Sequence, residues 1–125
     1  MDTKTAARER LDGQYAHLLA LSHRIHATPE LGFEEERACS WVAEALSAAG
    51  FAVTTGICDL PTALAARAGT GPLHIAICAE PEFTAHCITA AADKALYDGA
   101  LAMAWTVIDM ALDTGMRMRL LAGQG

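Results

Sequence analysis

The sequence lacks a basic surface, paired cysteines and a membrane-length apolar run, and each absence excludes a class of protein. Nine Lys and Arg residues stand against 15 Asp and Glu residues, which gives a formal net charge of -6 with no basic run. Nucleic acids and anionic membranes both require a positively charged face, so we expect neither as a partner. The four cysteines form no C-x-x-C pair, which favours free thiols in a reducing compartment over a zinc ribbon or redox pair.

The N-terminus has no apolar segment of the kind found in secretory signals, and no later run approaches the length that spans a bilayer. We therefore expect a cytoplasmic protein. What the sequence does contain is 53% hydrophobic residues, of which few are aromatic. This composition is typical of a globular, helix-rich protein, and the length predicts a single domain over residues 1–125.

Two amphipathic helices are predicted in the first half of the chain. Apolar residues recur at three and four positions from about Thr5 to Arg24, and again from Ala38 to Ala49. Pro29 and Gly32 separate these helices, because proline cannot continue a helix and glycine permits a turn with positive φ. The acidic run Glu34–Glu36 falls in the first turn of the second helix, where it complements the helix dipole.

Beyond Gly50 the apolar pattern changes to the two-residue period of strands. Strands are predicted at 51–55, 62–67, 73–79 and 116–122, and further helices at about 84–95 and 100–112. The stretch 73–79 is the central, buried strand of this interpretation. The predicted fold class is α/β, a mixed β-sheet of about four strands flanked by helices, in the order α-α-β-β-β-α-α-β.

Polar side chains crowd the stretch that follows the predicted central strand. In open α/β sheets, ligands bind in the crevice beyond the carboxyl ends of such strands. A histidine near neutrality, or a carboxyl group whose pKa is raised by burial, can transfer protons there without a metal. Glu82 and His86 are the candidate bases. Tyr97 and Asp98 are the candidate acids or orienting groups, with Glu80 in reserve.

The first half also carries many turn and helix residues in one distinctive order. They are LSHRIHATPELGFEE at Leu21–Glu35, followed by Trp41–Leu46, Gly50–Val53 and Leu60–Leu64. This order resembles the opening of the zinc-dependent aminoacylase and amidohydrolase metallopeptidases, the peptidase group that includes hippurate hydrolases. The resemblance implies a truncated form of that family's α/β catalytic domain, namely its N-terminal half.

The same resemblance implies that the family's zinc ligands are replaced here. The Asp-x-Asp motif of the family corresponds to Glu80-Pro81-Glu82, and its Cys-Gly-His-Asp motif best matches Ala95-Leu96-Tyr97-Asp98, which keeps only the aspartate. A catalytic zinc needs three protein ligands and one open position. We therefore expect no metal and no other cofactor, and no hydrolysis by the family's zinc mechanism.

Three functions stay open at this point. The first is a small-molecule-binding, metal-independent acid–base enzyme of the cyclase, isomerase or lyase type in a specialised biosynthetic pathway. The second is a non-catalytic binding or accessory subunit. The third is a residual metal-dependent amide hydrolase, with zinc on a set such as Glu82, His86, Cys87 and Asp98. Half a family domain leaves sheet edges and apolar faces uncovered, so a homo-oligomer or a protein complex is expected in each case.

Overall fold

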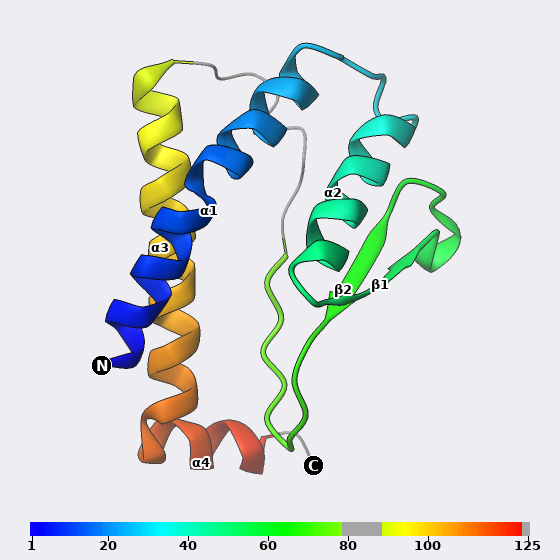
Figure 1. Cartoon of the computed structure of the whole chain (residues 1–125). Coiled ribbons are helices and arrows are strands. Elements are labelled where there is room, and N and C mark those ends of the chain that lie inside the picture. The colour runs from blue at the N-terminus through cyan, green and yellow to red at the C-terminus, as the bar shows by residue number, and fades with distance from the viewer. Residues whose placement is uncertain (79–88, 124–125) are drawn as a thin grey trace. The chain divides into compact units, whose positions relative to one another are not determined.

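The computed structural model describes residues 1–78 and 89–123 and is mostly helical (Figure 1). Its elements are α1 Thr3–His26, α2 Glu36–Ala48, β1 Ala52–Thr55, the short 3-10 helix η1 Ile57–Asp59, β2 Leu64–Arg67, α3 Ala90–Leu112 and α4 Thr114–Ala122. The chain divides into two compact units. The first contains the described residues of Met1–Leu18, Gly71–Ala79 and Ile88–Gly125, and the second contains Leu19–Thr70.

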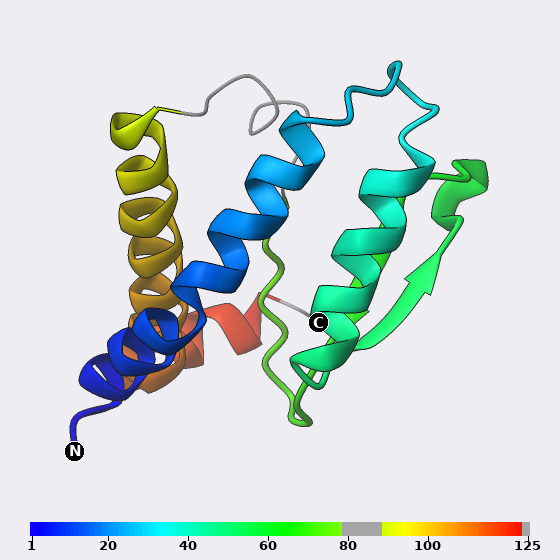
Figure 2. The same cartoon turned by 45° about the horizontal axis from the view of Figure 1, so that its top comes forward.

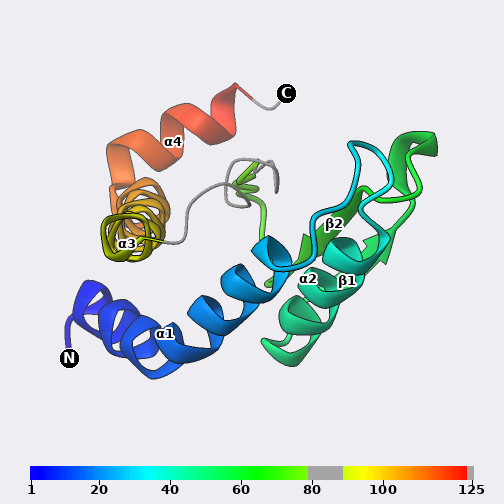
Figure 3. The ribbon, with the colours of Figure 1, turned by 90° about the horizontal axis from the view of Figure 1, so that it is seen from above.

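The second unit is a helix, a turn and a helix, followed by a β-hairpin (Figure 2). β1 and β2 are antiparallel, with Val53 opposite Ala66 and Thr54 opposite Ala65. The connection begins at Gly56, whose φ of 70° suits glycine and whose amide donates to the Ala63 carbonyl at 2.8 Å. α2 contacts both strands along one side of the hairpin (Figure 3). The hairpin is therefore held by its own ladder and by one helix.

A single carboxylate fixes the turn between α1 and α2. The two Glu30 carboxylate oxygens accept hydrogen bonds from the backbone amides of Arg37 and Ala38, each at 3.0 Å. These amides belong to the first turn of α2, where no helical carbonyl can accept them. Glu35, the residue that precedes α2, makes no side-chain capping bond. Glu30 thus caps the helix from outside it.

In the first unit, long side chains join the N-terminal half of α1 to α3. The Lys4 ammonium lies 2.7 Å from the Asp109 carboxylate, and the Lys4 carbonyl accepts a bond from the Trp105 indole at 3.2 Å. Further along α1, the Tyr15 hydroxyl donates to the Asp93 carbonyl at 3.0 Å. Residues near the start of α1 contact the later part of α3, and residues further along α1 contact its beginning. These two segments therefore run antiparallel.

The predicted α/β fold class is wrong. The described residues contain a two-stranded antiparallel sheet among helices, in place of a mixed sheet of about four strands in the order α-α-β-β-β-α-α-β. The first two predicted helices and the strands at 51–55 and 62–67 are confirmed as α1, α2, β1 and β2. The remaining strand predictions fail, each for its own physical reason.

The predicted strand at 116–122 is the helix α4. Its sequence alternates as a strand would, yet Met, Arg, Leu and Ala are all strong helix formers. The Asp113 carboxylate accepts a hydrogen bond from the Met116 amide at 2.6 Å and so caps the first turn. Propensity and capping therefore outweigh alternation. The predicted helices at 84–95 and 100–112 correspond to the single helix α3 from Ala90 onwards, which continues through Gly99.

The predicted central strand is absent from residues 73–78, and Ala79 lies outside the described residues. This segment runs as an open trace in the first unit (Figure 1). Among the described residues, none of its backbone N–H or C=O groups pairs with another backbone group. A strand is stabilised by backbone hydrogen bonds to a neighbouring strand. This segment has the amino-acid composition of a strand, but the described residues provide no neighbouring strand.

Few apolar side chains are buried within the described residues. Ala38 in α2 and Leu101 in α3 are the buried apolar residues there, and Ser22 is the buried polar one. Large apolar side chains stay exposed in both units, namely Met1, Leu31, Phe33, Phe51, Leu60, Ile77, Met103, Leu112 and Met118. Burial of apolar surface is the main favourable contribution to folding, so these uncovered faces need an explanation.

Of the described helices, α3 alone is long and apolar enough, by length and composition, to cross a membrane. No run of this kind was expected from the sequence. The helix carries four charged residues, Asp93, Lys94, Asp98 and Asp109. Apolar core helices of soluble proteins have the same length and composition, so this property by itself assigns no membrane role.

The capping role of Glu30 can be tested by its removal. We expect Glu30→Ala to lower the free energy of unfolding by about 1 kcal/mol, because two amides at the start of α2 lose their acceptor. Glu34→Ala is the matched control, since the Glu34 side chain has no hydrogen bond or ion pair within the described chain. Urea unfolding followed by circular dichroism measures both variants. Equal stability of the two variants would contradict the capping role.

Candidate functional site

The structure describes only part of the predicted catalytic set. Glu80, Glu82 and His86 lie outside the described residues. Tyr97 and Asp98 lie within the continuous helix α3, in the first unit. The candidate site can therefore be built from these two residues and from what they contact.

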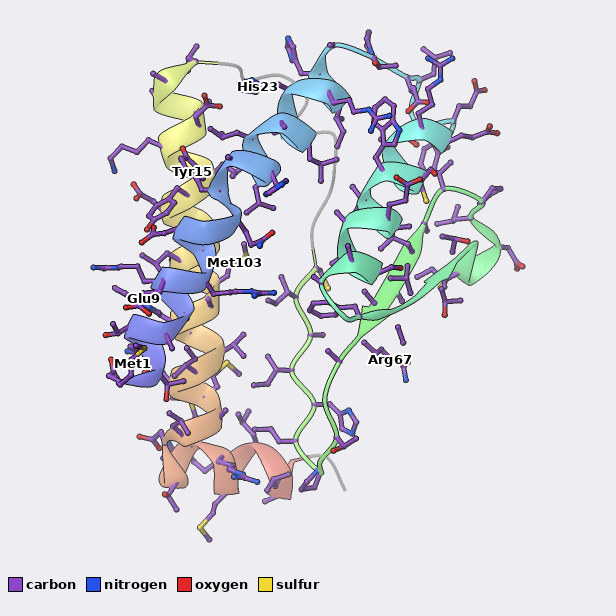
Figure 4. All side chains as sticks on the ribbon, viewed as in Figure 1. Met1, Glu9, Tyr15, His23, Arg67 and Met103 are labelled. Carbon is purple, nitrogen blue, oxygen red and sulfur yellow. The ribbon has the colours of Figure 1, made fainter. Side chains whose placement is uncertain are left out.

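Tyr97 reaches across to α1. Its hydroxyl donates a hydrogen bond to an Asp12 carboxylate oxygen at 2.5 Å. Its ring meets the Tyr15 ring edge to face, with 5.2 Å between the ring centres. Figure 4 shows Tyr15 on the side of α1 that faces α3. The two tyrosines and the aspartate form one contact between the helices, in which the polar tips are hydrogen-bonded and the rings pack together.

The environment of Tyr97 opposes ionisation. The hydrogen bond to Asp12 raises the pKa of the phenol above its usual value, because it stabilises the protonated phenol, which is its donor. Partial burial and the negative charges of Asp12 and Asp98 act in the same direction, and the Arg8 guanidinium opposes them. A general acid works best when its pKa lies near the operating pH, so this shift makes Tyr97 a poorer acid.

Asp98 makes its contact within its own helix. Its carboxylate forms an ion pair with Lys94, one turn earlier in α3, and both side chains are largely exposed. Pairs of this spacing contribute little to stability at a solvated surface. Successive residues on a helix point about 100° apart, and Tyr97 contacts α1 whereas Asp98 contacts Lys94. The two side chains therefore do not converge on one reacting group.

No group of three or more His, Cys, Asp or Glu residues in the described part of the chain could hold a metal ion. His23 and His26 are three positions apart at the end of α1, a spacing compatible with shared ligation. A third ligand is missing from the residues that the structure describes. The zinc set built on Glu82, His86, Cys87 and Asp98 lies outside the described residues except for Asp98.

The second unit has an open pocket of about 640 Å³ beside α2. Its lining residues are Glu36, Cys39, Ser40, Ala43, Glu44, Ser47, Thr55 and Pro61. Burial raises the pKa of the Cys39 thiol, which keeps it protonated near neutral pH and makes it a weak nucleophile. The pocket contains none of the predicted catalytic residues.

The first unit has an apolar groove of about 420 Å³ between the open segment and α3. Its lining residues are His74, Ile75, Ala76, Ile77, Ala102, Met103, Thr106, Val107 and Met110. Met103, labelled in Figure 4, is 47% exposed. None of the lining residues is an Asp, Glu, Lys or Arg, and His74 is the one residue among them that can gain or lose a proton, so the groove offers mainly apolar surface and no acid–base pair.

Sequence reasoning missed Asp12 and Glu30, both of which hold elements together. Lys4, Arg8 and Asp12 follow one another at four-residue spacing, which places them on one side of α1. The Lys4 and Arg8 side chains lie over the Trp105 ring at 5.7 and 5.0 Å from its centre. This polar stripe is the feature of the sequence that indicates a contact between this side of α1 and another polar and aromatic surface.

Comparison of the chain with protein-family models, with curated proteins and with solved structures finds no match. The geometry of the described residues is therefore the main support for any functional proposal.

The Tyr97 contact makes a prediction about pH. Because the folded-state pKa is raised above 10.0, the contribution of Tyr97 to stability is complete below that pH and is lost as the pH rises through the folded-state pKa. Asp12→Asn should lower the pKa of Tyr97 toward 10.0, since the carboxylate that opposes ionisation becomes a neutral amide. Titration of the tyrosinate absorbance measures this shift, and Tyr97→Phe separates the Tyr97 signal from that of Tyr15. An unchanged titration in Asp12→Asn would contradict the assignment.

Proposed function

We propose that this chain is a non-catalytic binding or accessory protein that descends from the aminoacylase and amidohydrolase metallopeptidases and works by associating with a protein chain. The observation that carries the proposal is the exposure of large apolar side chains in both units, with only Ala38 and Leu101 buried among the described apolar residues. Exposed apolar patches of this kind are typical of protein interaction sites.

The proposed descent is supported by what the matching residues do. In the segment Leu21–Glu35, Pro29 follows the end of α1 and Glu30 caps α2. Gly50 has a φ of 94° at the exit from α2, a conformation that favours glycine. These roles position a helix pair and a hairpin and require no metal. A descendant could therefore keep these residues for folding after the ancestral chemistry was lost.

A non-catalytic role is supported by the contacts of the two described candidates. The phenol of Tyr97 is held by Asp12, and the carboxylate of Asp98 is paired with Lys94. A catalytic pair would share access to one substrate atom, and these two side chains bind separate partners. The metal-independent enzyme proposed from the sequence loses support from both residues.

The proposal predicts that conservative replacement of the candidate catalytic residues preserves function. Asp98→Asn, Glu82→Gln and His86→Gln should each restore the phenotype of a strain that lacks the gene. Met103→Glu is the contrasting variant and should fail, because it places a charge on the exposed apolar face of α3. Circular dichroism measures whether each of the four variants is folded.

Two biochemical measurements accompany this test. Metal analysis of the purified chain should find far less than one zinc per chain, and acyl-amino-acid amides should not be hydrolysed when zinc is added. Loss of function in a folded His86→Gln or Glu82→Gln variant would contradict the proposal. Stoichiometric zinc with turnover would instead establish the residual hydrolase.

A further inference from the structure

The segment 73–78 offers a row of backbone hydrogen-bonding groups. Within the described chain, the backbone ladder ends at Arg67 in β2, and helical bonding resumes at α3. Between these points the residues Leu73, His74, Ile75, Ala76, Ile77 and Cys78 run as an open trace (Figure 1). An unpaired edge rich in β-branched and other apolar residues is a template for a strand from another chain.

The charge distribution favours a second copy at this edge. The chain carries a formal net charge of -6, so two copies repel each other at most orientations. No Asp, Glu, Lys or Arg occurs from Gly69 to Cys78, nor among the α3 residues that line the adjacent groove. Two copies that meet here bring no like charges face to face.

The groove beside the segment extends the apolar surface of this edge. Ile77 is 58% exposed on one side of it, and Met103 is 47% exposed on the other. A copy that pairs with the edge would also cover these side chains. Backbone pairing and apolar burial would then act at the same place.

We infer that two copies of this chain pair through residues 73–78 as antiparallel strands, about a two-fold axis that passes between the two Ile75 residues. In this register Ile75 lies opposite Ile75 of the second copy, and Leu73 lies opposite Ile77. A two-fold axis perpendicular to the paired strands keeps the same side chains on the same face, so Leu73, Ile75 and Ile77 form one apolar cross-strand layer. The edge of each segment that faces the second copy is then paired with an identical edge. The inference rests on the proposed function, because both require a protein chain as partner.

The register gives a test that depends on Ile75 meeting itself. We expect the wild-type chain to sediment as a dimer in analytical ultracentrifugation. Ile75→Lys and Ile75→Asp should each sediment as monomers, since each places two like charges directly opposite one another. An equimolar mixture of these two variants should regain the mass of a dimer. Circular dichroism of each separate variant reports whether it is folded.

Two controls keep the test decisive. Thr54→Lys puts the same charge on an exposed strand residue of the second unit and should remain dimeric. Ile77→Lys should weaken the dimer but change the free energy of unfolding of each chain little, because Ile77 is already 58% exposed. Backbone amides of residues 73–78 should exchange slowly with deuterium in the wild type and rapidly in Ile75→Lys.

The inference is overturned by a monomeric wild type, by a dimer that tolerates both charges at Ile75, or by a mixture of the charged variants that stays monomeric. Association of the wild type with a different protein but not with itself also overturns it. Failure here leaves the complementation result for Asp98→Asn, Glu82→Gln and His86→Gln untouched, so the two proposals can fail separately.

Discussion

The structure depends above all on the requirement that backbone N–H and C=O groups find partners. Inside the helices this requirement is met locally, and at the starts of α2, α3 and α4 a single side chain accepts one or two of the free amides. Glu30 supplies acceptors for α2, Thr89 for α3 and Asp113 for α4. The β1–β2 ladder meets it for the hairpin. In residues 73–78 a strand-like sequence occurs without a backbone partner in the described chain. The two functional proposals follow from this unpaired backbone and from the exposed apolar side chains.

The parts of the fold that could be predicted from the sequence are those determined by neighbouring residues. α1, α2 and the hairpin were found because apolar periodicity, Pro29 and the glycines act over a few positions. Prediction failed where the outcome depends on a distant partner or on a cap. Residues 73–78 have strand composition, but a ladder requires a second strand that composition cannot reveal. In α4, one bond from Met116 to Asp113 and strong helix propensity reversed the conclusion drawn from alternation.

The candidate site is harder to predict from the sequence than a helix or a hairpin, because a site requires side chains from separate elements. The prediction for Tyr97 rests on its place after a predicted strand and on its match to a metal-ligand motif. Its actual partner, Asp12, is 85 positions away on another helix, and no spacing in the sequence joins them. Only the four-residue stripe of Lys4, Arg8 and Asp12 indicated that this side of α1 faces another element. The roles of Glu80, Glu82 and His86, which lie outside the described residues, stay predictions, as do a cytoplasmic location and a small-molecule ligand.

The correction of the fold class also changes the meaning of the stretch around residue 75. In an α/β sheet, a run such as Leu73–Cys78 would be a buried central strand, and its apolar side chains would be explained by packing on both faces. In the described structure residues 74–77 of this run border an open groove, and Ile77 is 58% exposed. A sequence that suits a sheet interior but lies at an edge has its backbone groups and its apolar side chains uncovered together. One added strand would pair one edge of this backbone and cover apolar side chains at the same place, and the absence of charge from Gly69 to Cys78 allows that strand to come from an equally acidic copy.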